Sequence, residues 1–178
     1  LLYEAGWDDH DEDGILDKQI DGELVPFQFE ILVNSGNQLR KDIALVVQAE
    51  LEDIGIDCQV RELDWSIFLQ RADTQEFDAI VLGWTGNVRF PPDAFQIWHS
   101  SQAEGQGSNF ITFRNDEVDS ILETYRREFD ADKRVVLYQR FQEILHEEQP
   151  YTFLWKQRLA TSYARRFQGV NWYPGADR

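Results

Sequence analysis

Cysteine and methionine are almost absent from this 178-residue sequence, which contains one cysteine and no methionine. The single cysteine, Cys58, excludes an intrachain disulfide and a thiolate metal cluster. It lies in a predicted strand with no histidine near it in the sequence, so we interpret it as a small structural residue rather than a nucleophile. No apolar run approaches the roughly 18 residues that a membrane-spanning helix needs.

Basic residues are also scarce, because 17 lysines and arginines face 33 aspartates and glutamates, which gives a formal net charge of −16. This balance argues against a nucleic-acid partner, which requires a positive surface, and against binding to an anionic membrane. A solvated acidic surface that aids solubility is the simpler interpretation. The shortage of lysine is also typical of proteins in a salty environment, where ions screen self-repulsion. The lysines are Lys18, Lys41, Lys133 and Lys156.

The first six residues, LLYEAG, are typical of the last turn of a helix that ends at a glycine. We therefore expect the chain to be a piece of a longer protein, so that the absence of a visible signal peptide says nothing about its compartment. With 42% hydrophobic residues, the chain is rich enough in apolar side chains to build a core. Its length fits one domain over residues 1–178.

Strands and helices alternate in the first half of the sequence, and two further helices follow. This order predicts an α/β fold with a mostly parallel sheet covered by helices. The turn at residues 21–22 predicts a hairpin between residues 15–18 and the first long strand. Predicted strands cover residues 24–33, 56–63, 77–82, 151–155 and 159–163, and predicted helices cover residues 39–54, 65–69, 115–125 and 130–149.

An acidic loop at residues 8–16 suggests a calcium site. Asp9, Asp11, Asp13 and Gly14 match the D-x-D-x-D-G opening of a calcium-binding loop, whose alternate carboxylates point inward at a hard cation. The twelfth position, where a bidentate glutamate belongs, is Ile20, and Asp17 or Asp21 would have to replace it. The alternative is a solvated acidic turn in front of a hairpin, in a protein with no cofactor.

The most informative segment is the loop that follows the strand at residues 77–82. Ligands of α/β domains bind beyond the carboxyl ends of the strands, and this strand ends at Gly83-Trp84. Aromatic side chains there would stack on a ligand, and polar ones would hydrogen-bond to it, although most aromatics of any domain fill its own core. The candidate ligand-binding residues are Trp84, Thr85, Gly86, Asn87, Arg89, Phe90 and Asp93, with Trp65 as a secondary candidate.

No catalytic motif accompanies this loop. The three histidines are scattered, and the sequence contains neither an H-E-x-x-H zinc motif nor a G-x-S-x-G nucleophile elbow. A hydrolase that uses His99 with Ser100 or Asp93 remains the competing enzymatic interpretation. It requires His99 to lie within hydrogen-bond reach of a nucleophile in an open pocket.

Six segments in order resemble the second half of the extracellular solute-binding proteins of family 5, the dipeptide- and oligopeptide-binding group of ABC importers. They are LYEAGWDDHDEDG, NSGNQLRKDIALVVQAELEDIGID, LDWSIFLQRA, FDAIVLGW, NDEVDSIL and YQRFQEILHEEQPYTF. The resemblance implies a periplasmic-binding-protein-like lobe, namely most of the C-terminal lobe of a two-lobed protein. Peptide binders of the family carry, after Gly-Trp, an aspartate for the ligand's α-amino group, and this chain has Asn87 at about that position.

The resemblance also implies a function. The protein would be a receptor and not an enzyme, capturing a peptide or another small solute between two lobes and delivering it to a membrane permease. It would not span the membrane itself. The expected location is periplasmic or extracytoplasmic, with a lipoprotein anchor on the full-length protein as one form. The alternatives are an oligosaccharide-binding member of the same family, a hydrolase and a calcium-stabilised interaction module.

Overall fold

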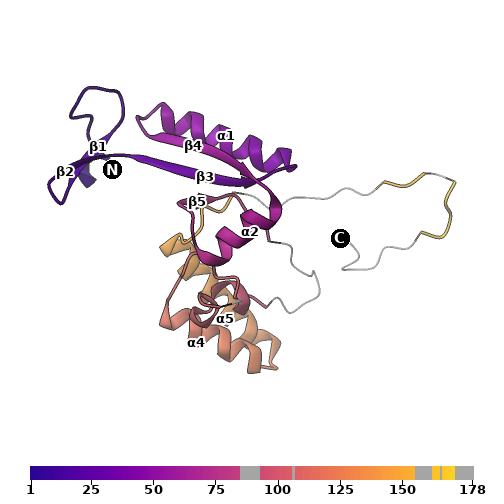
Figure 1. Cartoon of the computed structure of the whole chain (residues 1–178). Helices are drawn as coiled ribbons and strands as arrows, with labels where there is room; N and C mark the ends of the chain where they lie inside the picture. Colours follow the sequence, from indigo (N-terminus) through magenta and orange to yellow (C-terminus); the bar gives the residue numbers. More distant parts are fainter. Residues whose placement is uncertain (85–92, 106, 155–161, 165, 171–178) are drawn as a thin grey trace. The chain divides into compact units, whose positions relative to one another are not determined.

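A computed structural model describes residues 1–84, 93–105, 107–154, 162–164 and 166–170. Within it the chain forms two compact units, Leu1–Gly83 and Trp84–Arg178, which are described separately below (Figure 1). The prediction that residues 1–178 together form one lobe stays a prediction. No helix in the described residues is both long and apolar enough to cross a lipid bilayer.

The first unit is built on a three-stranded parallel sheet. Strand β3 (Gln28–Asn34) lies at its centre, between β4 (Asp57–Leu63) and β5 (Ala79–Ile80). Helices α1 (Gln38–Glu52) and α2 (Trp65–Thr74) make the two crossovers, which run in opposite directions from strand to strand. Because such crossovers are right-handed, the two helices cover opposite faces of the sheet (Figure 1). The predicted parallel sheet covered by helices is confirmed.

Alternation along β3 explains the two-sided core of this unit. Ile31 and Val33 pack with Cys58 and with Ala44 of α1, while Leu32 points to the other face, where α2 packs against β3. The Cys58 side chain is fully buried, and burial raises the pKa of its thiol. A buried neutral thiol has no nucleophilic role, which agrees with the structural interpretation of this cysteine.

The first unit also contains the predicted hairpin, formed by β1 (Asp17–Ile20) and β2 (Glu23–Pro26). Both turn residues, Asp21 and Gly22, have positive φ, as two-residue hairpin turns require. The prediction of one continuous strand over residues 24–33 is wrong, because β2 ends at Pro26 and β3 begins two residues later. Proline has no N–H for the ladder, and the next N–H, that of Phe27, donates to the Leu16 carbonyl.

The second unit is helical. Short helix α3 (Phe95–Trp98) and the 3-10 turn η2 (Ser100–Gln102) precede two longer helices, α4 (Asp116–Arg127) and α5 (Ala131–Glu148). The side chains of Asn115 and Asp130 accept backbone N–H bonds at the starts of α4 and α5, as N-cap residues do. The α5 helix ends at Glu148, just before Pro150. In the first unit, a short 3-10 turn, η1 (Tyr3–Ala5), precedes the hairpin.

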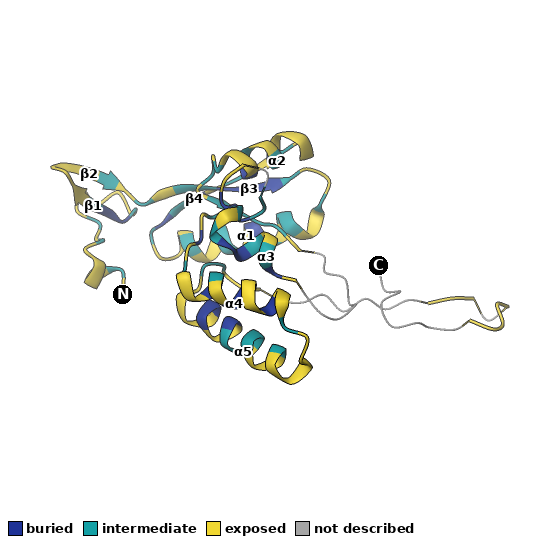
Figure 2. Ribbon diagram, turned by 90° about the horizontal axis from the view of Figure 1, so that it is seen from below, coloured by how far each residue is buried: buried dark blue, intermediate teal, exposed yellow. Residues whose placement is uncertain are grey.

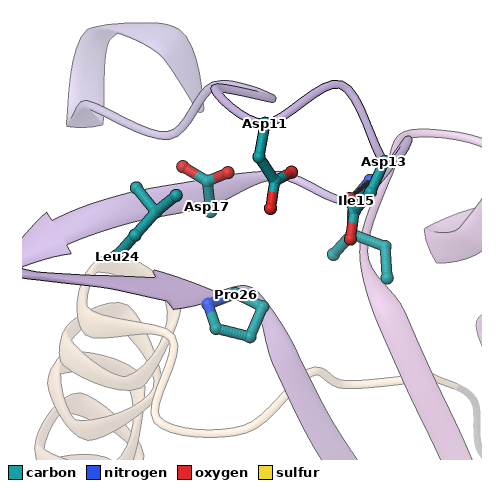
Figure 3. Close-up of a pocket in the computed structure, with 6 residues that line it drawn as sticks. All are labelled: Asp11, Asp13, Ile15, Asp17, Leu24 and Pro26. Carbon is teal, nitrogen blue, oxygen red and sulfur yellow. Dashed lines mark hydrogen bonds between the residues drawn. The ribbon is translucent and has the colours of Figure 1, made fainter.

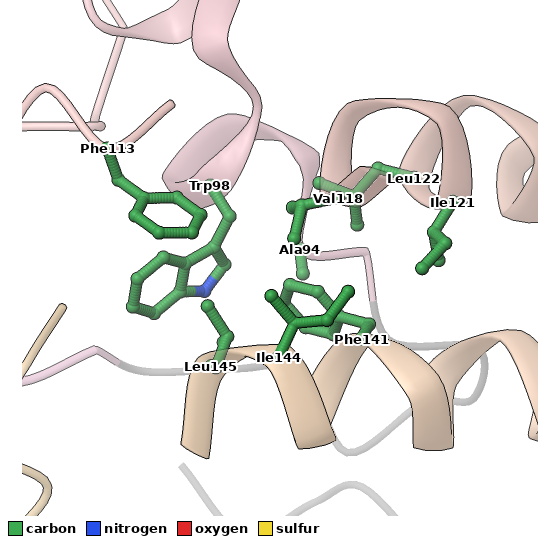
Figure 4. Close-up of a cluster of buried hydrophobic side chains, with 9 residues drawn as sticks. All are labelled: Ala94, Trp98, Phe113, Val118, Ile121, Leu122, Phe141, Ile144 and Leu145. Carbon is green, nitrogen blue, oxygen red and sulfur yellow. The ribbon is translucent and has the colours of Figure 1, made fainter. Parts of the chain in front are cut away.

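The buried faces of α4 and α5 enclose one hydrophobic cluster, which Figure 2 shows in dark blue and Figure 4 shows in detail. Trp98 meets Phe113 and Phe141 edge-on within it. The cluster consists of Ala94, Trp98, Phe113, Val118, Ile121, Leu122, Phe141, Ile144 and Leu145.

Two predicted strands are not found where the structure describes them. Residues 151–154 and 162–163 form no strand, and the rest of both predictions lies outside the described residues. An apolar run becomes a strand only where another strand accepts its hydrogen bonds, and the three-stranded sheet pairs no strand with either segment. Strand β5 is also shorter than the predicted strand at residues 77–82.

Candidate functional site

The carboxyl ends of the three parallel strands lie at one edge of the sheet in the first unit. Asn34 ends β3, Asp64 and Trp65 follow β4, and Val81 to Gly83 follow β5. Ligands of open α/β sheets bind outside this edge. This edge is where the sequence predicts a ligand, and the topology brings the ends of β3 and β4 to the same edge as the end of β5.

Arg40 joins these strand ends, although the sequence analysis did not select it. Its Nη1 donates to the Asn34 side-chain oxygen over 2.6 Å, and its guanidinium carbon lies 5.8 Å from the centre of the Trp65 ring. A methyl group added to Gly83 would lie 3.8 Å from Arg40 Nη2, so the chain beyond β5 also passes close by. The sequence did contain one indication of this position, because Arg40 lies in the first turn of the helix that follows the end of a predicted strand.

Trp65 is half-exposed at this edge, with 48% of its surface accessible. Its ring stacks on that of Phe68 with centroids 5.7 Å apart, and Phe68 is fully buried. The inner face of Trp65 is thus anchored to the core while the rest of the ring remains available. This is the arrangement expected of a stacking platform.

Trp84 begins the second unit and is 43% exposed. Its ring stacks on Phe110 with centroids 5.7 Å apart, and its indole N–H donates to the Tyr151 hydroxyl. Burial raises the pKa of Tyr151, and this hydrogen bond partly offsets that effect. Trp84 is therefore held in one orientation with a large part of its surface exposed, as its predicted stacking role requires.

The remaining predicted ligand residues divide into two groups. Thr85, Gly86, Asn87, Arg89 and Phe90 lie outside the described residues. Asp93 is described, and its carboxylate is already engaged.

Arg126 donates two N–H groups to Asp93, with the shortest contact at 2.7 Å from Nη2 to Oδ2. These hydrogen bonds hold the pKa of Asp93 below its usual value. The Phe95 backbone N–H donates to the same carboxylate, and the Arg126 guanidinium lies 3.8 Å from the centre of the Phe95 ring. Asp93 thus stabilises the start of α3, and a ligand would have to share it with Arg126.

The hydrolase interpretation is wrong for the pair His99 and Ser100. His99 is buried and stacks on Phe95 with ring centroids 4.0 Å apart, and its Nδ1 accepts the Ser101 backbone N–H. The Ser100 hydroxyl donates instead to the Asp119 carboxylate. A histidine whose neighbouring serine hydroxyl is bonded to a carboxylate instead cannot activate that serine for acyl transfer.

The acidic loop brings together a different set of carboxylates from the one predicted. Oxygens of Asp9, Asp11 and Asp17 lie within 4.8 Å of one another, and Asp17 is buried. Asp13 is not in this group, and its side chain instead accepts the Ile15 N–H. Of the two residues that could replace the missing glutamate, Asp17 is the one that lies beside Asp9 and Asp11.

Hydrogen bonds within the loop already use most of these oxygens. Asp9 accepts the backbone N–H groups of Asp13 and Gly14, and Asp17 accepts both the His10 backbone N–H and its Nδ1, the latter at 2.6 Å. The hydrogen bond to Asp17 raises the pKa of His10 and so favours its positively charged form. A positive charge beside these carboxylates disfavours a metal cation there. Calcium takes six to eight oxygens. These residues fit a tight structural turn better than a calcium site.

A hollow of about 120 Å³ lies between this loop and β2 (Figure 3). Small-molecule sites usually enclose roughly 300–1,000 Å³, so the hollow is too small for a peptide. Its lining residues are Asp11, Asp13, Ile15, Asp17, Leu24 and Pro26.

Comparison with known proteins identifies the family. Residues 1–106 match the sequence model of the bacterial extracellular solute-binding proteins, family 5 Middle. This chain belongs to that family. Family 5 relatives include the oligopeptide-binding protein AppA of Bacillus subtilis, which is 35% identical over 179 residues, covering 99% of this chain and 32% of the relative.

Two solved structures agree with the fold. AppA of B. subtilis in complex with a nonapeptide matches with a TM-score of 0.75 and 38% identity, over 86% of this chain and 29% of that one. NikZ from Campylobacter jejuni in complex with Ni(L-His) matches with a TM-score of 0.69 and 28% identity, over 84% of this chain and 29% of that one. The chain thus spans about a third of the length of these relatives, and the predicted family and periplasmic-binding-protein-like fold are confirmed.

Proposed function

We propose that this chain is most of the C-terminal lobe of the substrate-binding component of an ABC importer, and that the whole protein captures a peptide between two lobes. The observation that carries the proposal is the match to an oligopeptide-binding protein over 99% of the chain. Two half-exposed tryptophans, each anchored on another aromatic ring, support it, because apolar platforms with few polar groups are typical of small-ligand sites.

The proposed mechanism is capture followed by closure. The ligand bridges the lobes and favours the closed form, which a membrane permease recognises. Trp84 stacks on the ligand, Thr85 and Asn87 hydrogen-bond to it, and Gly86 permits close approach of the backbone. In this mechanism the protein is a receptor that releases its ligand chemically unchanged to the permease.

The proposed location is extracytoplasmic, since the family consists of extracellular solute-binding proteins. A lipoprotein anchor on the full-length protein would keep the receptor beside its permease. The chain's net charge of −16 argues against a nucleic-acid partner.

Calorimetry on the two-lobed protein tests this function. Titration with alanine peptides of two to nine residues should reveal saturable binding of at least one length, with a negative heat-capacity change from buried apolar surface. Maltose and maltotriose serve as comparison ligands for the oligosaccharide alternative. Binding of the sugars without binding of any peptide would refute the peptide function while leaving the receptor function intact.

A further inference from the structure

Phe110 is the ring against which Trp84 stacks, and it lies outside every helix and strand of the described residues. It is 9% exposed, and its ring centroid lies 5.7 Å from that of Trp84, with 21° between the ring planes. It belongs to a turn over residues 109–113, between η2 and α4. Because no helix or sheet ladder fixes the backbone there, other hydrogen bonds have to do so. The position of the Trp84 ring therefore depends on what fixes this turn.

Asn109, which is 1% exposed, fixes this turn through its side-chain amide. Its Oδ1 accepts the Phe113 backbone N–H over 3.0 Å, and its Nδ2 donates to the Phe113 carbonyl over 2.8 Å. The same Nδ2 donates to the His99 carbonyl over 3.3 Å, which ties the turn to the end of α3. The amide thus joins the two ends of the turn that carries Phe110, and both of its donor hydrogens are used inside the protein.

The turn also contains a strained residue, Thr112, whose φ is +53°. A β-branched residue rarely adopts this left-handed region, because its side chain crowds the backbone there. Such a conformation persists only where the surrounding contacts impose it. The next residue, Phe113, is held both by the Asn109 amide and by edge-on packing on Trp98, with ring centroids 5.8 Å apart (Figure 4). Without the amide, we expect the turn to relax away from the conformation that places Phe110.

We propose that Asn109 is a positioning residue of the proposed receptor, which holds the strained turn and thereby keeps Phe110 in place against Trp84. The inference rests on the proposed function, in which Trp84 stacks on the ligand. Asn109 itself is too deeply buried to contact a ligand, so it acts only through the aromatic pair. Its loss should therefore weaken ligand binding only while Trp84 is present, whereas a residue that merely stabilises the fold shows no such dependence.

A double-mutant cycle on the two-lobed protein tests this dependence. Asn109→Asp keeps the size of the side chain, but its carboxylate has no N–H to donate and faces the carbonyls of His99 and Phe113. Calorimetry at pH 7 should show that this variant binds the tightest-binding alanine peptide about 5- to 20-fold more weakly than the parent, because the displaced ring loses part of its contact. In a Trp84→Ala background the same substitution should change the Kd by less than about twofold, since no ring is left to position.

Two further variants separate positioning from stability. Asn109→Ser introduces no charge and keeps one hydroxyl donor, so its loss of affinity should be smaller and should show the same dependence on Trp84. Asn115→Ala is the matched control, because the Asn115 side chain also accepts backbone N–H groups, those of Glu117 and Val118 at the start of α4. It should lower the melting temperature through the lost helix cap and leave the Kd unchanged.

The outcomes separate the two claims. Binding within about twofold of the parent by the folded Asn109 variants, or an equal loss of affinity in the Trp84→Ala background, overturns the positioning role and leaves the receptor intact. Failure of both Asn109 variants to fold overturns it as well, because Asn109 would then serve the fold itself. Absence of binding by the parent to every alanine peptide overturns the proposed peptide function and this inference with it. Melting temperatures, measured beside the parent, identify the variants that are folded.

Discussion

The stacking role of Trp84 leads to the most quantitative prediction. A tryptophan side chain buries up to about 250 Å², and 43% of Trp84 is exposed, which leaves ~110 Å² for a ligand to cover. At about 25 cal/mol per Å², covering that surface contributes at most ~2.7 kcal/mol, or an ~80-fold change in Kd. We therefore predict that Trp84→Ala weakens binding of the tightest-binding alanine peptide by between about 10- and 80-fold, as measured by isothermal titration calorimetry.

Two further variants make this prediction sharper. Trp84→Phe keeps a ring that can stack on Phe110 but loses the hydrogen bond to Tyr151, so it should fall between the parent and Trp84→Ala. Phe129→Ala removes an aromatic side chain that is 98% exposed and serves as the matched control, with an unchanged Kd. A folded Trp84→Ala protein that binds the peptide within about twofold of the parent would refute the argument that this exposed ring contacts ligand.

Three other predictions concern stability and metal binding. Leu122→Ala, at a site 2% exposed, should lower the free energy of unfolding by about 2–5 kcal/mol in denaturant titrations, whereas Val136→Ala, at 65% exposure, should have little effect. Because the folded-state pKa of Asp93 is lowered by Arg126, its stabilising contribution is present above the unfolded pKa and is lost as the pH falls through the folded value. Asp93→Asn should therefore flatten the acid limb of the stability curve below about pH 4, by less than about 1 kcal/mol for so exposed a pair. Millimolar calcium should leave the melting temperature unchanged, since hydrogen bonds already use the carboxylate oxygens of Asp9 and Asp17, and a rise that Asp11→Asn abolishes would show the loop to be a calcium site.

The order of elements and most helix starts could be read from the sequence because they depend on neighbouring residues. Asn37, Asn115 and Asp130 each accept backbone N–H groups within three residues, so short polar side chains were enough to place the helices. The hairpin turn at Asp21-Gly22 is equally local.

The strand errors had a different origin. The apolar character of residues 151–154 favoured a strand, but the described sheets offer them no partner, and β2 separated from β3 at Pro26 because its hydrogen bonds went to β1. Strand formation depends on which backbone groups are brought alongside, and a single sequence does not contain that information.

The candidate site shows the same division between local and long-range information. The sequence alone determined that a glycine and a tryptophan follow a predicted strand. Only the tertiary structure decided that Asp93 pairs with Arg126, which lies 33 positions away, and that Arg40 meets Asn34 and Trp65. Charges pair according to distance in the folded chain, and folding sets that distance through strand register and helix packing.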